Sequence, residues 1–227
     1  MARRARQTQF LLPMRVWDAP TRLFHWLLVV LLPACFLAAE LGWMDWHLRL
    51  GYAVLALFLF RIAWGFVGSD TARFGRFLTS PLAGLRHLAT FRVREPDTQV
   101  GHNAAGGWMV LVMLLLIGVE LGSGLGANDG LGVYEGPLAR HVGEHASDLL
   151  TVIHATTKLL LIVAVGLHVL AIVLYAVVKR HDLVRPMLTG KKRLPAATRA
   201  PRMASSLLAL LLFALAAAVA VVVATRV

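Results

Sequence analysis

The chain has 227 residues, of which 58% are hydrophobic and 15% are charged, and its mean hydropathy is +0.70. This composition excludes an ordinary soluble domain and predicts a single-domain, all-α integral membrane protein with several spans. The net charge of +11 does not indicate nucleic-acid binding, because Lys and Arg cluster at the ends of apolar runs, where such residues set membrane topology. The single cysteine, Cys35, excludes a disulfide framework and any metal site built on several cysteines.

Five apolar runs are long enough to cross a bilayer, which needs about 20 residues. The first run follows the arginine-rich segment 1–22 and resembles a signal peptide. No convincing small-x-small cleavage site follows it, so we expect this run to be retained as a span. The expected spans are at about 23–41, 47–67, 103–121 and 149–178, with a fifth at 205–224.

The connections between the spans differ in charge. Three segments are rich in Arg and Lys, namely 1–22, 68–101 and 179–202, whereas 42–46 and 122–148 are poor in basic residues. The positive-inside rule therefore places the three basic segments in the cytoplasm and the other two outside. We expect a multi-pass protein of a bacterial inner membrane, with a cytoplasmic amino terminus and a periplasmic carboxyl terminus.

The fourth span carries two histidines, His154 and His168, whose spacing is unusual for a membrane helix. Fourteen residues are close to four helical turns, so the two imidazoles lie near one face and roughly 21 Å apart along the axis. An ionisable side chain in lipid is costly and needs a partner, and neutral imidazole is the commonest metal ligand among side chains. The spacing predicts two stacked metal centres, one towards each side of the membrane, if other helices supply partners at matching depths.

Topology supplies such partners. His25 opens the first span on the cytoplasmic side, and His47 opens the second span on the outer side. Two bis-histidine pairs follow, His25 with His168 and His47 with His154, each joining two helices as a flat macrocycle with two axial imidazoles requires. His102, at the start of the third span, is the main rival to His25. The alternative is that these histidines are polar anchors hydrogen-bonded to neighbouring helices.

Three sequence segments, together with the two histidines of the fourth span, resemble one known family. They are residues 16–26 (VWDAPTRLFHW), residues 101–108 (GHNAAGGW) and residues 182–192 (DLVRPMLTGKK). Over about residues 14–192 the chain resembles the bacterial cytochrome b561 and nickel–iron hydrogenase di-haem cytochrome b family. One departure from the family pattern is Ala155, at a position where an acidic residue is common.

This resemblance implies a di-haem transmembrane four-helix bundle over residues 23–192, with the fifth span as an addition outside it. It implies two b-type haems, bound through the same four histidines that depth matching selects, and a quinone as electron partner. It also implies a periplasmic redox protein, such as a hydrogenase or a c-type cytochrome, as the other partner. The iron ligands that it implies are His25, His47, His154 and His168.

Four further residues are candidates for contacts with haem or quinone. Arg22 and Arg61 lie near the cytoplasmic ends of their spans and could pair with haem propionates, because Arg grips carboxylates bidentately, or could simply mark topology. Lys158 lies one turn below His154 and could contact a propionate or a quinone, or could pair with Glu120. His102 could hydrogen-bond a propionate or a quinone rather than ligate iron.

Three functions are compatible with these features. The first is an electron-transfer subunit that links a periplasmic redox protein to the quinone pool. The second is a stand-alone quinone-linked oxidoreductase that acts on a small periplasmic species such as superoxide. The third, from another class, is a transporter or a haem-free membrane anchor.

Overall fold

The computed structural model describes residues 10–93, 95–130 and 133–226. Residues 1–9, which carry three arginines of the expected cytoplasmic segment, lie outside this range. Within it, five helices are long and apolar enough to cross a membrane, which confirms an all-α membrane fold. They are α1 (Ala19–Glu40), α2 (Met44–Val67), α5 (Ala104–Gly126), α7 (Glu144–Leu174) and α9 (Ser206–Arg226).

Helix boundaries differ from the expected spans where local caps decide them. Helix α1 begins at Ala19, four residues before the apolar run, because the Asp18 side chain accepts a hydrogen bond from the Thr21 N–H at 2.6 Å and proline stands in the first turn. Helix α7 begins at Glu144, five residues before the expected start at 149. It continues into a π-helical turn, η1 (Tyr175–Lys179), and ends where Arg180 adopts a left-handed conformation with φ of 60°.

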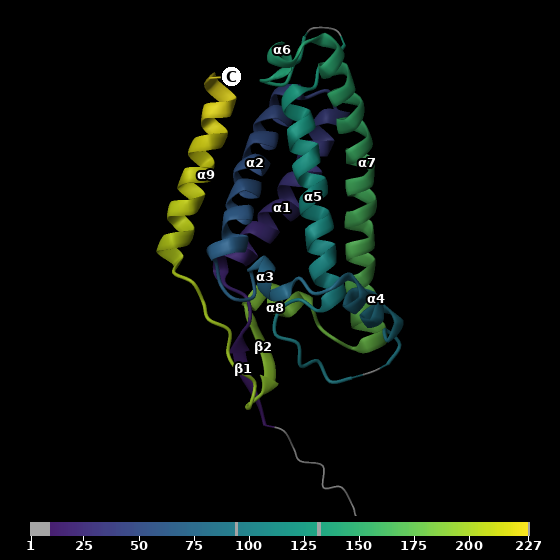
Figure 1. Ribbon diagram of the computed structural model, residues 1–227, viewed down its shortest axis with the longest axis vertical. Helices are drawn as coiled ribbons and strands as arrows, with labels where there is room; N and C mark the ends of the chain where they lie inside the picture. Colours follow the sequence, from purple (N-terminus) through teal and green to yellow (C-terminus); the bar gives the residue numbers. More distant parts are fainter. Residues whose placement is uncertain (1–9, 94, 131–132, 227) are drawn as a thin grey trace, which may run out of the picture.

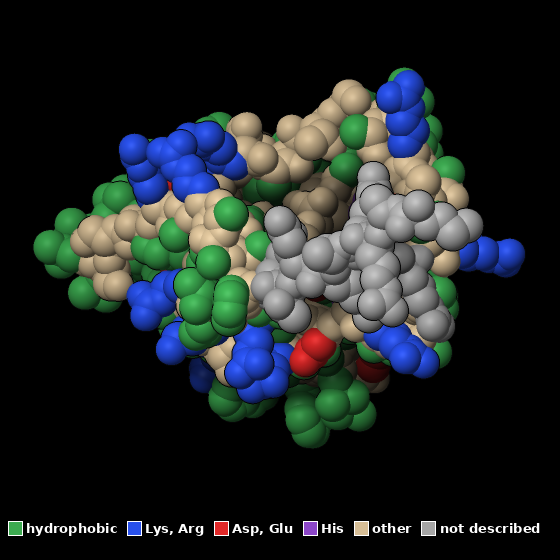
Figure 2. All heavy atoms as spheres, turned by 90° about the horizontal axis from the view of Figure 1, so that it is seen from below, with side chains coloured by type: hydrophobic (Ala, Val, Ile, Leu, Met, Phe, Trp, Pro, Cys, Tyr) green, Lys and Arg blue, Asp and Glu red, His purple; other side chains and the backbone are tan. Residues whose placement is uncertain are grey.

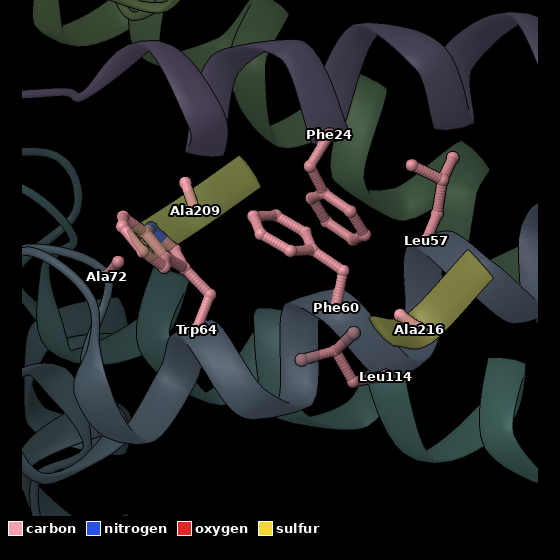
Figure 3. Packing of buried hydrophobic residues seen from close by; sticks show 8 residues of the cluster. All are labelled: Phe24, Leu57, Phe60, Trp64, Ala72, Leu114, Ala209 and Ala216. Atoms are coloured by element: carbon pink, nitrogen blue, oxygen red, sulfur yellow. The ribbon is translucent and has the colours of Figure 1, made fainter. Parts of the chain in front are cut away.

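Helices α1, α2, α5 and α7 form the bundle, and α9 lies outside it against α2 (Figure 1). Helix α5 packs on α7, and α1 packs on α2. The largest apolar cluster joins α1, α2 and α5 to α9, and Figure 3 shows the rings of Phe24, Phe60 and Trp64 together with Ala209 and Ala216 of α9. Small side chains on α9 allow it to lie close to the α2 backbone.

The two ends of the bundle are built differently. At one end, β1 (Leu11–Arg15) pairs antiparallel with β2 (Lys191–Pro195), and this end also carries α3, α4 and α8 (Figure 1). We call it the hairpin end for short, although the two strands lie far apart in the sequence and are not joined by a turn. At the other end, called the loop end, lie α6 and the carboxyl terminus. The short helices are α3 (Phe74–Phe77), α4 (Pro81–Ala89), α6 (Ala139–Val142) and α8 (Val184–Thr189).

Basic side chains gather at the hairpin end. Figure 2 looks onto this end and shows Lys and Arg side chains around its rim, with few acidic ones. Helix α4 lies at this end and begins at the Ser80 cap, whose side chain accepts a hydrogen bond from the Ala83 N–H. It packs on α5 through Gly84, which lies against Trp108 and Ala104, while Leu82, Leu85 and Leu88 are exposed. An exposed apolar face beside basic residues is typical of a helix at a membrane surface.

Candidate functional site

Two pairs of histidine side chains lie inside the bundle, one in each half of its length. Nearer the loop end, His47 of α2 faces His154 of α7, and their ring centroids are 6.1 Å apart. Nearer the hairpin end, His25 of α1 faces His168 of α7, with ring centroids 6.4 Å apart. The fold thus brings together the two pairs expected from the sequence, and their role as iron ligands stays a prediction.

Backbone carbonyls orient the pair near the loop end. The Nδ1 atom of His47 is 3.0 Å from the carbonyl oxygen of Cys35, and that of His154 is 2.8 Å from the carbonyl oxygen of Glu120. A carbonyl oxygen can only accept, so each Nδ1 carries the hydrogen and donates it. Each Nε2 therefore keeps a free lone pair, which is the arrangement that metal-ligating histidines generally show.

The spacing within each pair fits two axial ligands on one metal. Two metal–nitrogen bonds of about 2 Å, together with the radii of two imidazole rings, separate the ring centroids by roughly 6 Å. Aromatic rings in simple edge contact can also lie about 4.5–7 Å apart. What favours ligation is therefore the recurrence of this spacing at two depths, combined with the free Nε2 atoms of His47 and His154.

The His47 and His154 side chains line an apolar cavity, whose other walls come from α1, α2, α5 and α7. Gly124 makes room for the His154 ring, because a Cβ atom at Gly124 would lie 2.8 Å from His154 Cε1. Glu120 also lines this cavity, with Oε1 3.6 Å from His154 Nε2 and a buried Oε2 that has no hydrogen-bond partner among the described residues. The site thus offers two imidazoles in an apolar surround with one carboxyl group beside them.

Arg61 is a buried cation in the half nearer the hairpin end. Its side chain is only 3% exposed, and its Nη1 atom has no hydrogen-bond partner among the described residues. The guanidinium carbon lies 5.0 Å from the ring centroid of Phe74. The nearby carboxylate of Asp18 already accepts hydrogen bonds from two other groups. A buried, incompletely paired charge is costly, so Arg61 is suited to bind an anionic group inside the bundle.

Arg22 has a different role in the structure. It donates a hydrogen bond from Nη1 to the carbonyl oxygen of Leu188, and Trp26 donates one to the carbonyl oxygen of Met187 at 3.2 Å. These two bonds fasten the start of α1 to the end of α8. The Nε atom of Arg22 is buried and has no hydrogen-bond partner among the described residues, so this N–H of the guanidinium group can still donate a hydrogen bond.

Lys158 forms an ion pair with a residue outside its expected partners. Its Nζ atom is 2.8 Å from Oε1 of Glu40, the last residue of α1. Glu120, the alternative partner considered for Lys158, lies beside His154 instead, with its Oε1 atom 3.6 Å from His154 Nε2. The ion pair ties α7 to α1 in the half nearer the loop end.

His102 lies just before α5 and packs between two aromatic rings. Its ring centroid is 4.7 Å from that of Trp17 and 4.8 Å from that of Phe77, and its buried Nδ1 has no hydrogen-bond partner among the described residues. Burial lowers its pKa to about 3, and the positive charge of Arg61 acts in the same direction. His102 is therefore neutral at physiological pH.

A polar cluster at the hairpin end was missed from the sequence. The Nε2 atom of His87 lies 2.7 Å from the hydroxyl oxygen of Tyr175, and this oxygen accepts a hydrogen bond from the Asn103 amide at 2.9 Å. Tyr175 follows His168 by seven residues and so lies on the same face of the helix, which is the one signal that could have indicated it. The cluster joins α4, the start of α5 and η1.

A family model described as prokaryotic cytochrome b561 matches residues 16–190. The chain belongs to the prokaryotic cytochrome b561 family. Searches of curated proteins and of solved structures found no match. Members of this family are membrane cytochromes with b-type haem, so the chain is a multi-pass b-type cytochrome that transfers electrons. The matched residues contain all four paired histidines, whereas α9 lies outside them.

The donor set fits the b-type haem that membership in the cytochrome b561 family implies. A haem brings four nitrogen ligands of its own, so the protein needs to supply only the two axial ones. Each histidine pair can supply two imidazoles, and the cavity at the His47–His154 pair has the apolar walls that a macrocycle requires. Arg61, whose Nη1 has no hydrogen-bond partner in the described part of the chain, is suited to a propionate in the other half.

Proposed function

We propose that this cytochrome b561 holds two b-type haems, one at each histidine pair, and passes electrons between a periplasmic redox protein and the quinone pool. The observation that carries the proposal is the presence of two histidine pairs in opposite halves of the bundle. Their ring centroids are 6.1 Å apart in one pair and 6.4 Å apart in the other. Two centres at two depths let electrons cross the membrane in two steps. Haem b, when bound, supplies a one-electron iron couple at each step.

The side chains at the two sites would bind the haems, and their neighbours would orient the ligands. His47 and His154 would hold one iron, and His25 and His168 the other, with the Cys35 and Glu120 carbonyls fixing the rings of the first pair. Arg61 would neutralise a propionate in the half nearer the hairpin end. Leu161 is fully buried on α7, midway between His154 and His168, and would separate the two haems.

We infer that the hairpin end faces the cytoplasm and the loop end faces the periplasm of a bacterial inner membrane. The support is charge: the hairpin end carries basic side chains around its rim (Figure 2), whereas the connection at the loop end is glycine-rich and acidic. A periplasmic hydrogenase or c-type cytochrome would therefore dock at the loop end, nearer His47 and His154.

The test is the haem content of the purified protein. A pyridine haemochrome assay should give close to two haems per chain, and a reduced-minus-oxidised spectrum should show b-type bands. His145→Ala is a matched control, because His145 is exposed at the loop end and should leave the content unchanged. A content near zero would overturn the proposal, and a content near one would remove one of the two pairs.

Electron exchange with quinone is tested on the same preparation. A reduced, water-soluble quinol analogue with a short alkyl chain should reduce both spectral components under anaerobic conditions. Components that dithionite reduces but the quinol leaves oxidised would contradict the quinone partner while leaving the haem assignment intact.

A further inference from the structure

Helix α4 lies against the bundle at the level where two membrane helices end (Figure 1). Gly84 of α4 packs against Trp108 of α5, and the Trp108 indole donates a hydrogen bond to the carbonyl oxygen of Thr79 at 3.1 Å. His87 of α4 contacts Tyr175, which directly follows α7. Helix α5 has 23 residues. Its length of roughly 34 Å slightly exceeds a hydrocarbon core of roughly 30 Å, so α4 lies at the depth of the lipid headgroups.

Three leucines form an exposed stripe along α4. Leu82, Leu85 and Leu88 follow one another at intervals of three residues, so they share one face of the helix. Their exposed fractions are 54%, 63% and 54%. The face that carries Gly84 and His87 packs on the bundle instead. At headgroup depth, the acyl chains of the bilayer can remove such a stripe from water.

Basic side chains without acidic partners accompany this stripe. Residues 71–94 include five arginines and no acidic residue. Arg86 and Arg92 are exposed, and neither guanidinium group forms a hydrogen bond or an ion pair with any residue that the structure describes. Lys179 of η1 is only 7% exposed, and its ammonium group lies 5.8 Å from the ring centroid of Phe91 without pairing with a described carboxylate. The exposed side of α4 therefore combines an apolar stripe with positive charge that its described neighbours do not neutralise.

We propose that α4 binds anionic phospholipid, with its three leucines among the acyl chains and Arg86 and Arg92 at the phosphate groups. Such a lipid carries a negative charge and apolar chains on one molecule, which matches both features of this face. A zwitterionic lipid would cover the leucines but would leave the arginine charge without a counterion. The Lys179 ammonium can reach the same phosphate groups from its buried stem. Bound lipid would also hold α4 in place and so preserve the contact between His87 and Tyr175 at the end of α7.

The first experiment measures the lipid preference of the full chain in detergent. The chain is incubated with equal amounts of phosphatidylglycerol and phosphatidylcholine that have the same acyl chains. Free lipid is removed by gel filtration, and the retained lipids are quantified by mass spectrometry. Each Lys or Arg near an anionic surface changes the binding constant roughly fivefold, so phosphatidylglycerol should be retained roughly tenfold over phosphatidylcholine. Equal retention of the two lipids would overturn the proposal.

Two matched double variants locate the preference on the protein. Arg86→Gln combined with Arg92→Gln should lower the ratio of retained phosphatidylglycerol to phosphatidylcholine roughly fivefold or more. Arg193→Gln combined with Arg199→Gln removes the same charge from exposed positions at the hairpin end but away from α4, and should leave the ratio unchanged. Far-UV circular dichroism checks that both variants stay folded. An equal fall in both would overturn the proposal, because the preference would then follow net charge and not this face.

The second experiment tests whether the leucine stripe lies in lipid. Nitroxide labels are placed at Leu85→Cys and, as the control on the water side, at Arg199→Cys, in full chain reconstituted into vesicles that contain phosphatidylglycerol. The label at position 85 should collide more often with oxygen, which concentrates in hydrocarbon, than with a water-soluble nickel chelate, and the label at position 199 should show the reverse. Equal access of the nickel chelate to both labels would overturn the proposal and would indicate a face open to a soluble acidic partner. Neither experiment requires haem or quinone, so this proposal and the proposed function can fail separately.

Discussion

At the residue scale, the two histidine pairs are held in different ways. His47 and His154 each donate Nδ1–H to a backbone carbonyl, whereas the buried Nδ1 of His25 has no partner among the described residues. A donated Nδ1–H fixes both tautomer and ring orientation. The pair nearer the loop end is therefore oriented by the protein before any metal binds.

The pairing itself predicts how substitutions should group. His25→Ala and His168→Ala should each remove the same spectral component, because loss of either axial ligand leaves the same iron under-coordinated. His47→Ala and His154→Ala should both remove the other component. The measurement is the reduced-minus-oxidised spectrum together with haem content.

His102→Ala serves as the discriminating variant for this grouping. His102 packs between Trp17 and Phe77 rather than against another histidine, so two haems should stay bound. Should His102→Ala abolish one component while His25→Ala spares it, the ligand nearer the hairpin end would be His102.

Leu161, which lies midway between the two histidine pairs, should contribute to the stability of the fold. Its side chain is fully buried against Val54 and Ile117, seven residues from both His154 and His168. Leu161→Ala should lower the free energy of unfolding by about 2–5 kcal/mol, the usual cost of a cavity at such a site. Leu160→Ala is the control, because Leu160 is 52% exposed on the same helix and should have a much smaller effect. Equal losses in a denaturant titration of both variants would contradict this packing argument.

At the element scale, local sequence predicts helices better than it predicts their ends and contacts. A run of apolar residues is a local property, so all five membrane helices were expected at nearly the right places. The start of α1 depends on the Asp18 cap, and the contacts Lys158–Glu40 and His87–Tyr175 join residues 118 and 88 positions apart. Such partners are chosen by how the helices pack, which periodicity does not encode. Depth along a helix does follow from the sequence, which is why the histidine partners could be expected.

The contact of His87, on α4, with Tyr175, on η1, leads us to expect that stability depends on pH. Burial lowers the pKa of His87, the charge of Lys179 acts in the same direction, and Glu95 opposes it. A histidine with a lowered pKa in the folded state takes up its proton more readily when unfolded. Its contribution to stability is therefore complete above the unfolded pKa of about 6.5 and is lost as the pH falls further.

The measurement is thermal unfolding at pH 7.5 and at pH 5. The wild-type Tm should fall more over this interval than the Tm of His87→Gln, which keeps a polar side chain of similar length but cannot titrate. Tyr175→Phe should weaken the same contact at both pH values. Identical pH dependence in wild type and His87→Gln would show that the drop arises elsewhere.

At the scale of the whole molecule, the arrangement is a bundle with chemically distinct ends. The amino-terminal strand and the basic rim lie at the hairpin end, and the carboxyl terminus lies at the loop end (Figures 1 and 2). An odd number of crossing helices requires the two ends of the described chain to lie on opposite sides of a membrane. Locating either end of the chain on one side of the membrane therefore determines the orientation of all five helices in the described chain.

Cysteine labelling tests this topology on intact cells or right-side-out vesicles. The native Cys35 is buried and should not react, so single introduced cysteines report their own side. His145→Cys, exposed at the loop end, should be labelled by a membrane-impermeant maleimide from outside. Arg199→Cys, exposed in the connection between β2 and α9, should be labelled only after the membrane is made permeable. The reverse pattern would place the hairpin end outside, and the docking side for the redox partner would then move to that end, nearer His25 and His168. That outcome would leave the two histidine pairs untouched, because their depths relative to each other are fixed by α7 and not by the direction in which the bundle was inserted.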